Sequence, residues 1–118
     1  MGADTERLLQ LSLLGEAVDC VEEVAVFVWN DDRRYVAVNE TACRLVGLGR
    51  RELIGMPVGD LSPDGAADDI ARVRTARTVE GTSSFTRPDG EVVELSWTTA
   101  RTRIAGLPYM VSVCRRVN

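Results

Sequence analysis

The sequence predicts an α+β domain built on a five-stranded antiparallel sheet, with helices between the second and third strands. Three observations carry this prediction: two short strand-like runs joined by a turn, three longer ones joined by turns at the end of the chain, and helical patterns between them. Strands joined by tight turns run antiparallel, which excludes a doubly wound parallel sheet. The 118 residues fit one such domain with a modest core.

The first expected element is an amphipathic helix over residues 6–21, where apolar residues recur at steps of three and four. Further leucines give it more apolar surface than one core face needs. We therefore expect it to pair with a second chain, and packing on its own sheet is the alternative. The expected interface residues are Leu8, Leu11, Leu14 and Val18. The chain then divides into a dimerisation helix, residues 1–22, and a domain, residues 23–118.

A hairpin is expected next. Residues 24–29 and 34–38 are rich in β-branched and aromatic side chains, and turn-forming residues separate them. Asn39 can then cap a helix by accepting the amide proton of Thr41 or Ala42.

Glycines are expected to end two helices in the middle of the chain. Gly47 can stop the helix that Asn39 starts, and Gly55 can stop a one-turn helix that begins near residue 50. Pro57 then prevents this short helix from continuing. Residues 60–65 follow as a loop or helix entry.

The last part of the chain predicts one helix and three strands. A second amphipathic helix is expected over residues 66–79, and strands over residues 82–87, 91–104 and 109–117. The turn sequences Arg-Pro-Asp-Gly and Ala-Gly-Leu-Pro separate these strands. The elements therefore follow one another as helix, two strands, helices and three strands.

Two stretches resemble the PAS domain, a sensory module of bacterial signalling proteins: "YVAVNETACRLVGLGRRELIGMPVGDLSP" and "FTRPDGEVVELSWTTARTRIAGLPYMVSVCRRV". The resemblance spans about residues 24–117. The sequence has the residues that shape the family's scaffold: an Asn that caps a helix, two glycines that end helices, a Pro-Asp pair in a loop and an Asp-Gly pair in a hairpin turn. In this sequence these are Asn39, Gly47, Gly55, Pro63-Asp64 and Asp89-Gly90.

This resemblance implies a sensory or regulatory module that forms a homodimer. The short apolar runs and the absence of a signal-peptide pattern lead us to expect it in the cytoplasm. Such a module passes a signal to an output such as a histidine kinase of a two-component system, a cyclic-dinucleotide enzyme or a transcription factor. The alternative is a small enzyme or carrier protein that uses the same curved-sheet pocket.

The family's cofactors are not expected here. Haem-binding members usually ligate haem through histidine, and this chain has none. Flavin-binding light sensors of the LOV type carry a reactive cysteine in an Asn-Cys-Arg-Phe-Leu-like motif, which Cys43-Arg44-Leu45 matches only in part. Ala42 precedes the cysteine, and Val46 stands where the motif has Gln. We expect Cys43 to be a packed thiol and no flavin to bind.

Catalytic chemistry has little support in the sequence, so we expect no enzyme. Without histidine there is no Ser-His or Cys-His pair, and neither metal-ligand spacing nor a phosphate-binding glycine loop occurs. The net charge of −4 argues against nucleic-acid binding. The longest apolar run, "VAVFVW", is too short to cross a membrane, and the N-terminus lacks a signal-peptide pattern.

The space between sheet and helices is the candidate binding site. By the two-residue period of strands, Val93, Leu95, Trp97 and Thr99 share one face. Which face looks toward the helices stays open at this point. The expected lining residues are Cys43, Val46, Ile54, Ile70, Val73, Phe85, Leu95, Trp97, Thr99 and Ser112. This lining suits a small, mostly apolar ligand held by one or two hydrogen bonds. The alternative is that these side chains fill a small core.

The opposite face of the sheet is also expected to be apolar, because Tyr109, Val111 and Val113 alternate with the residues of the first face. The inserted helices can cover only one face. The N-terminal helix or a partner chain should cover the other.

Overall fold

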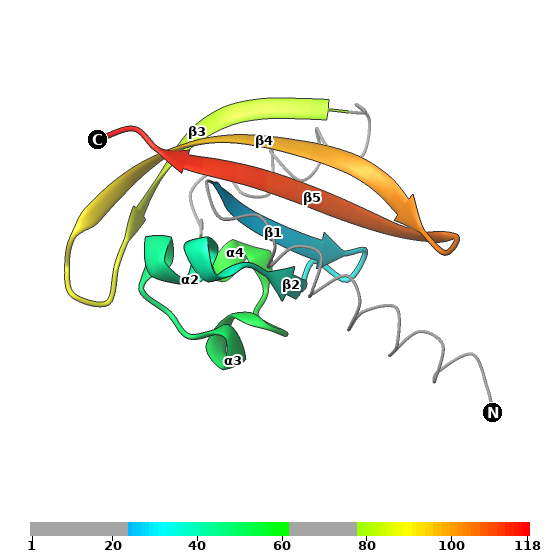
Figure 1. Cartoon of the computed structure of the whole chain (residues 1–118), viewed down its shortest axis with the longest axis horizontal. Coiled ribbons are helices and arrows are strands. Elements are labelled where there is room, and N and C mark those ends of the chain that lie inside the picture. The colour runs from blue at the N-terminus through cyan, green and yellow to red at the C-terminus, as the bar shows by residue number, and fades with distance from the viewer. Residues whose placement is uncertain (1–23, 62–77) are drawn as a thin grey trace.

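The computed structural model describes residues 24–61 and 78–118, which form five strands and three short helices (Figure 1). The expected N-terminal helix, with Leu8, Leu11, Leu14 and Val18, lies outside the described residues, as does most of the second amphipathic helix. The elements in chain order are β1 (Ala25–Asn30), β2 (Tyr35–Val38), α2 (Glu40–Val46), α3 (Arg50–Leu53), α4 (Val58–Leu61), β3 (Thr78–Thr86), β4 (Val92–Ile104) and β5 (Leu107–Arg116).

The strands form one sheet in the order β2-β1-β5-β4-β3, and each neighbouring pair is antiparallel. This confirms the predicted α+β class and the five-stranded antiparallel sheet. The last strand, β5, lies at the centre of the sheet between β1 and β4, so the first and last strands are neighbours. Residues far apart in sequence, such as Trp29 and Met110, are thereby brought opposite each other.

Two predicted strand boundaries are wrong. The third strand begins at Thr78 rather than Thr82, so Thr78 and Val79 belong to β3 and not to the end of a helix. Both residues are β-branched, and they pair with Ala100 and Thr99 of the long strand β4, an interaction that the helical pattern could not reveal.

The last strand begins at Leu107 rather than Tyr109, because the β4–β5 turn is shorter than expected. Only Ala105 and Gly106 form it, with φ angles of 52° and 81°. Positive φ at both central residues matches the right-handed twist of a two-residue hairpin.

Asn39 starts α2 as predicted. Its side-chain Oδ1 accepts the amide proton of Ala42 at 2.8 Å, and its backbone is extended, as an N-cap requires. Gly47 ends the helix in the left-handed conformation, with φ of 73°, and its N–H donates to the Cys43 carbonyl. The asparagine also belongs to the sheet, since Oδ1 accepts from Val26 N and Nδ2 donates to Val24 O.

The segment after α3 is bonded to the edge of the sheet. Gly55 N donates to Tyr35 O at 2.8 Å, Tyr35 N donates to Met56 O at 3.1 Å, and Val58 N donates to Arg33 O at 2.9 Å. The Arg34 guanidinium adds a bond to the Gly55 carbonyl. Residues 55–58 therefore lie along the edge of β2, held by these backbone bonds and by one isolated β-bridge between Arg34 and Pro57.

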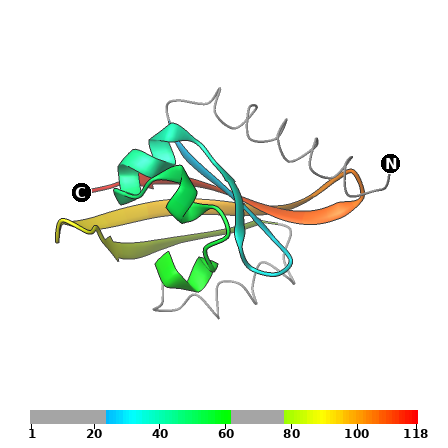
Figure 2. The ribbon, with the colours of Figure 1, turned by 90° about the horizontal axis from the view of Figure 1, so that it is seen from below.

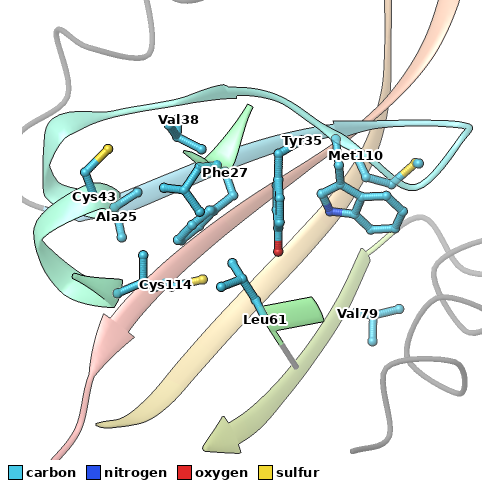
Figure 3. Packing of buried hydrophobic residues seen from close by; sticks show 13 residues of the cluster. Ala25, Phe27, Tyr35, Val38, Cys43, Leu61, Val79, Met110 and Cys114 are labelled. Atoms are coloured by element: carbon cyan, nitrogen blue, oxygen red, sulfur yellow. The ribbon is translucent and has the colours of Figure 1, made fainter. Parts of the chain in front are cut away.

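The helices α2, α3 and α4 lie together on one side of the sheet (Figures 1 and 2). Their buried residues join those of one sheet face in a cluster that we call the inner cluster. Its members are Ala25, Phe27, Trp29, Tyr35, Val38, Ala42, Cys43, Val46, Leu53, Leu61, Val79, Met110 and Cys114 (Figure 3).

A second cluster, the outer cluster, consists of Val26, Val28, Ala37 and Tyr109. Val26 and Val28 alternate with the inner-cluster residues of β1, so they occupy the opposite face of the sheet. They are nevertheless buried, and Val28 has no exposed surface. Apolar residues are therefore buried on both faces of the sheet, although Val113, which the sequence placed on this outer face, is 39% exposed.

Candidate ligand site on the inner face of the sheet

The face of β4 that carries Leu95 and Trp97 looks toward the helices. Val93, Leu95 and Thr99 are buried, and Trp97 packs against the inner cluster, whereas Glu94 and Ser96 are exposed. The period of two places all residues of each set on one side of the strand. The question that the sequence left open is thereby answered.

Trp97 lies flat over β3 because its partner there has no side chain. Gly81 pairs with Trp97, and a Cβ built on Gly81 would come within 2.5 Å of the indole Cζ2. A glycine inside a strand often marks such a close approach. The indole therefore occupies the space that a larger residue in β3 would fill.

Three polar side chains form a chain of hydrogen bonds across the inner face. The Trp29 Nε1–H of β1 donates to Ser112 Oγ of β5 at 3.2 Å. Ser112 Oγ in turn lies 2.6 Å from Thr99 Oγ1 of β4, with either hydroxyl as the donor. The two bonds link neighbouring strands in the order β1-β5-β4, so we call these residues the inner-face triad.

Tyr35 adds a fourth polar group to the same face. Its ring is tilted against Phe27, with the centroids 5.5 Å apart, and Figure 3 shows its hydroxyl directed toward the side of the cluster where Leu61 lies. Burial, with a smaller contribution from Cys114, raises the pKa of Tyr35 well above its usual range, so the hydroxyl stays protonated. Burial also raises the pKa of the Cys114 thiol to about 12.

The predicted lining residues fall into three groups. Seven lie on the inner face or on α2 against it: Cys43, Val46, Phe85, Leu95, Trp97, Thr99 and Ser112. Ile54, in contrast, is 41% exposed and lies outside both clusters. Ile70 and Val73 are outside the described residues.

Sequence reasoning missed Trp29 and Tyr35. Trp29 shares the period of two with Ala25 and Phe27 along β1, so the strand pattern could have placed all three together. Tyr35 was harder to place, because the register of β1 and β2 shifts between Val28 and Trp29. Such an irregularity changes which side chains share a face and leaves no mark in the sequence.

Arg87 connects the far end of the sheet with α2. Its Nη1 donates to the carbonyls of Arg44 and Leu45 at 2.9 and 3.3 Å, which satisfies carbonyls at the end of the helix. Its Nε lies 3.6 Å from an Asp89 carboxylate oxygen. The β3–β4 turn and the helix that borders the inner cluster are therefore joined by one side chain.

Within residues 24–61 and 78–118, no group of three or more acidic, cysteine or histidine side chains is arranged to hold a metal ion. None of the helices in these two ranges has both the length and the apolar content needed to cross a bilayer.

A five-stranded antiparallel sheet with helices inserted after the second strand and packed on one face defines a class of small α+β domains. A family model of the PAS domain matches residues 23–114, and the chain belongs to this family. PAS domains are generally sensory, non-catalytic modules. A search among curated proteins finds no significant match.

Solved structures share the fold. A PAS domain from a two-component sensor histidine kinase is 18% identical with a TM-score of 0.73, and the alignment covers 98% of this chain and 100% of that one. The PAS domain of an HTR-like protein from Haloarcula marismortui is 18% identical with a TM-score of 0.75, covering 97% and 98%. A LOV protein from Rhodobacter sphaeroides is 16% identical with a TM-score of 0.76, covering 94% and 68%. At these identities the likeness establishes the fold alone.

Proposed function

We propose that this chain is a cytoplasmic PAS module that forms a homodimer and passes a change in its inner cluster to an output protein or domain. The output is a histidine kinase of a two-component system, a cyclic-dinucleotide enzyme or a transcription regulator. Similar structures come from a two-component sensor histidine kinase and a blue-light activated histidine kinase, which favours the first of these.

The burial of both sheet faces is the observation that carries the proposal. The inner cluster includes residues of α2, α3 and α4, whereas Val26, Val28, Ala37 and Tyr109 lie buried on the other side. A sheet with two apolar faces needs two covers. We assign the second cover to residues 1–22, whose apolar stripe of Leu8, Leu11, Leu14 and Val18 is broad enough to contact a second chain as well.

The inner face supports binding of a small, mostly apolar ligand between sheet and helices. Its lining combines apolar residues such as Val46, Phe85 and Leu95 with the hydroxyls of Thr99 and Ser112. Binding sites for small molecules typically have this composition, predominantly apolar with a few polar groups. A ligand there would contact the sheet and α2 together.

Catalysis is not part of the proposal. Among the described residues the buried polar side chains are Asn39 and Thr99, and Asn39 is occupied by the helix cap and the start of β1. Neither is a general acid or base near neutral pH. An enzyme or carrier protein would need such groups inside the domain.

Native mass spectrometry of the purified protein tests dimerisation and ligand binding together. We expect a dimer, and a Leu11→Glu variant that is folded but monomeric, because a charge on the apolar stripe cannot be buried. Gln10→Glu, one residue off the stripe, is the matched control and should stay dimeric. A wild-type monomer would refute the dimeric module. Retained flavin would refute the assignment of Cys43 as a packed thiol.

A further inference from the structure

The guanidinium of Arg87 is packed closely against the end of α2. Its Nη1 donates to the carbonyls of Arg44 and Leu45 at 2.9 and 3.3 Å. The group also lies against Gly47, the residue that ends the helix, where an added Cβ would be 3.3 Å from Nη2 and 3.4 Å from Nε. The approach is this close because the glycine has no side chain.

This position leaves one donor of Arg87 without an acceptor. Its Nε is buried, and within residues 24–61 and 78–118 no atom accepts the Nε proton. A buried donor in this state has lost its hydration without compensation, which is unfavourable. The nearby carboxylate of Asp89 has its Oδ2 3.6 Å from Nε, which is too far for a hydrogen bond.

The end of α2 and Asp89 therefore compete for the guanidinium. On α2, Nη1 has its carbonyl acceptors but Nε is unsatisfied. On Asp89, which is 59% exposed, Arg87 would gain a charge-assisted bond and hydration, and the carbonyls would lose their donor. Each arrangement has a contribution that the other lacks, so their free energies differ little. Asp89 Oδ1 accepts from the Glu91 N–H at 2.9 Å, which keeps the carboxylate in the turn beside Arg87.

The β3–β4 turn is also bonded to the residues that follow β5. Glu91 forms an ion pair with Arg116, whose Nε donates to the side-chain oxygen of Asn118. The Asn118 side chain is in turn bonded to the backbone of β4, since its Nδ2 donates to Val92 O and its Oδ1 accepts from Glu94 N. The turn is therefore connected to α2 on one side and to the end of β5 on the other.

We propose that Arg87 is a latch with two positions, one on the end of α2 and one on Asp89. In the first position, that of the structure, α2 is held to the β3–β4 turn. In the second, the end of α2 is released from the turn. The inference rests on the proposed function in one respect, because the latch supplies a route by which a change at α2 reaches the end of β5. The exchange between the two positions itself requires neither a ligand nor a second chain.

Hydrogen exchange of the full chain, followed by NMR, measures the release of α2. The N–H groups of Gly47 and Leu48 both donate to the Cys43 carbonyl at the end of the helix, so their exchange reports local opening there. Asp89→Asn keeps an acceptor oxygen in the turn but removes the charge that competes for Arg87. We expect both amides to exchange about 2-fold to 5-fold more slowly in this variant, the range that one exposed ion pair supports.

Two controls separate this effect from others. Glu91→Gln removes a carboxylate from the same turn, but one that pairs with Arg116, and should leave exchange at Gly47 and Leu48 unchanged. All rates are compared with that of the Val28 amide, which lies inside the sheet between β2 and β5 and reports global unfolding.

Unchanged exchange in Asp89→Asn would show that Arg87 has a single position and would overturn the latch. Faster exchange would overturn it as well, because Asp89 would then be holding Arg87 on α2 instead of competing for it. An equal slowing in Glu91→Gln would assign the effect to the net charge of the turn and not to a second partner of Arg87. The proposed dimeric module is judged separately by its subunit number, which none of these results changes.

Discussion

Replacing Asn39 with alanine should destabilise the domain more than any other single hydrogen-bonding change in β1, β2 or α2. Asn39 is fully buried, and its side chain serves three backbone groups. Oδ1 accepts from Ala42 N at 2.8 Å and from Val26 N at 3.0 Å, and Nδ2 donates to Val24 O at 2.8 Å. The variant Asn39→Ala removes all three bonds at once.

The size of the effect follows from these bonds. Loss of the helix cap costs about 1 kcal/mol. The buried N–H of Val26 loses the side-chain acceptor, which costs about a further 1–3 kcal/mol. The free energy of unfolding should therefore fall by about 2–4 kcal/mol, a large part of the total stability of a small domain.

Urea denaturation followed by tryptophan fluorescence measures this loss. The transition midpoint of Asn39→Ala should fall by about 1–2 M urea at an unchanged slope. Asn39→Asp keeps the two acceptor bonds but cannot donate to Val24, so its stability should lie between those of Asn39→Ala and the wild type.

Asn30→Ala is the matched control, because Asn30 makes a similar bond to a backbone N–H, that of Arg34 at 3.1 Å, but in an exposed turn. It should lose less than about 1 kcal/mol. If Asn39→Ala and Asn30→Ala were equally stable, the argument that burial makes the Asn39 bonds important would be wrong.

Three further changes have defined outcomes. In Gly81→Ala the new Cβ would meet the Trp97 indole, so the free energy of unfolding, measured with urea, should fall by about 1–3 kcal/mol and the Trp97 fluorescence should shift. Gly59→Ala is the control and should change neither, because no heavy atom lies within 4 Å of its added Cβ. Arg87→Ala should cost about 1–3 kcal/mol in the same assay, because carbonyls at the end of α2 lose a charged donor; a loss below about 0.3 kcal/mol would contradict this. The pKa of Cys114 rises from 9.0 to about 12 on folding, so the thiol's contribution to stability is complete below pH 9 and is lost as the pH rises toward 12. Between pH 9 and 10 the free energy of unfolding should fall by about 1 kcal/mol per pH unit. The fall should be flatter in Cys114→Ala. An equally steep fall in that variant would show that the Cys114 thiol is not its cause.

The strands and helix caps that were predicted correctly are those determined by residues close to one another in sequence. Asn39 and Gly47 cap α2 through backbone groups within a few residues, so their positions could be inferred from local spacing. The alternation along β4 likewise grouped Leu95 with Trp97.

The candidate site was predicted only in part, because its geometry depends on pairing between distant strands. The triad exists because β1 and β5 lie side by side, which brings Trp29 next to Ser112 across 83 positions of sequence. The early start of β3 has the same cause, since pairing with β4 decided it. Local propensity carries no information about such partners.

The bonds between residues 55–58 and the end of β2 also affect how the domain behaves among its neighbours. An open strand edge presents unpaired N–H and C=O groups that can recruit a strand from another molecule. Here the N–H and C=O of Tyr35 are already bonded to Met56 and Gly55. An invading strand would first have to displace the domain's own segment, so this edge is protected against the strand exchange that leads crowded β-rich proteins to aggregate.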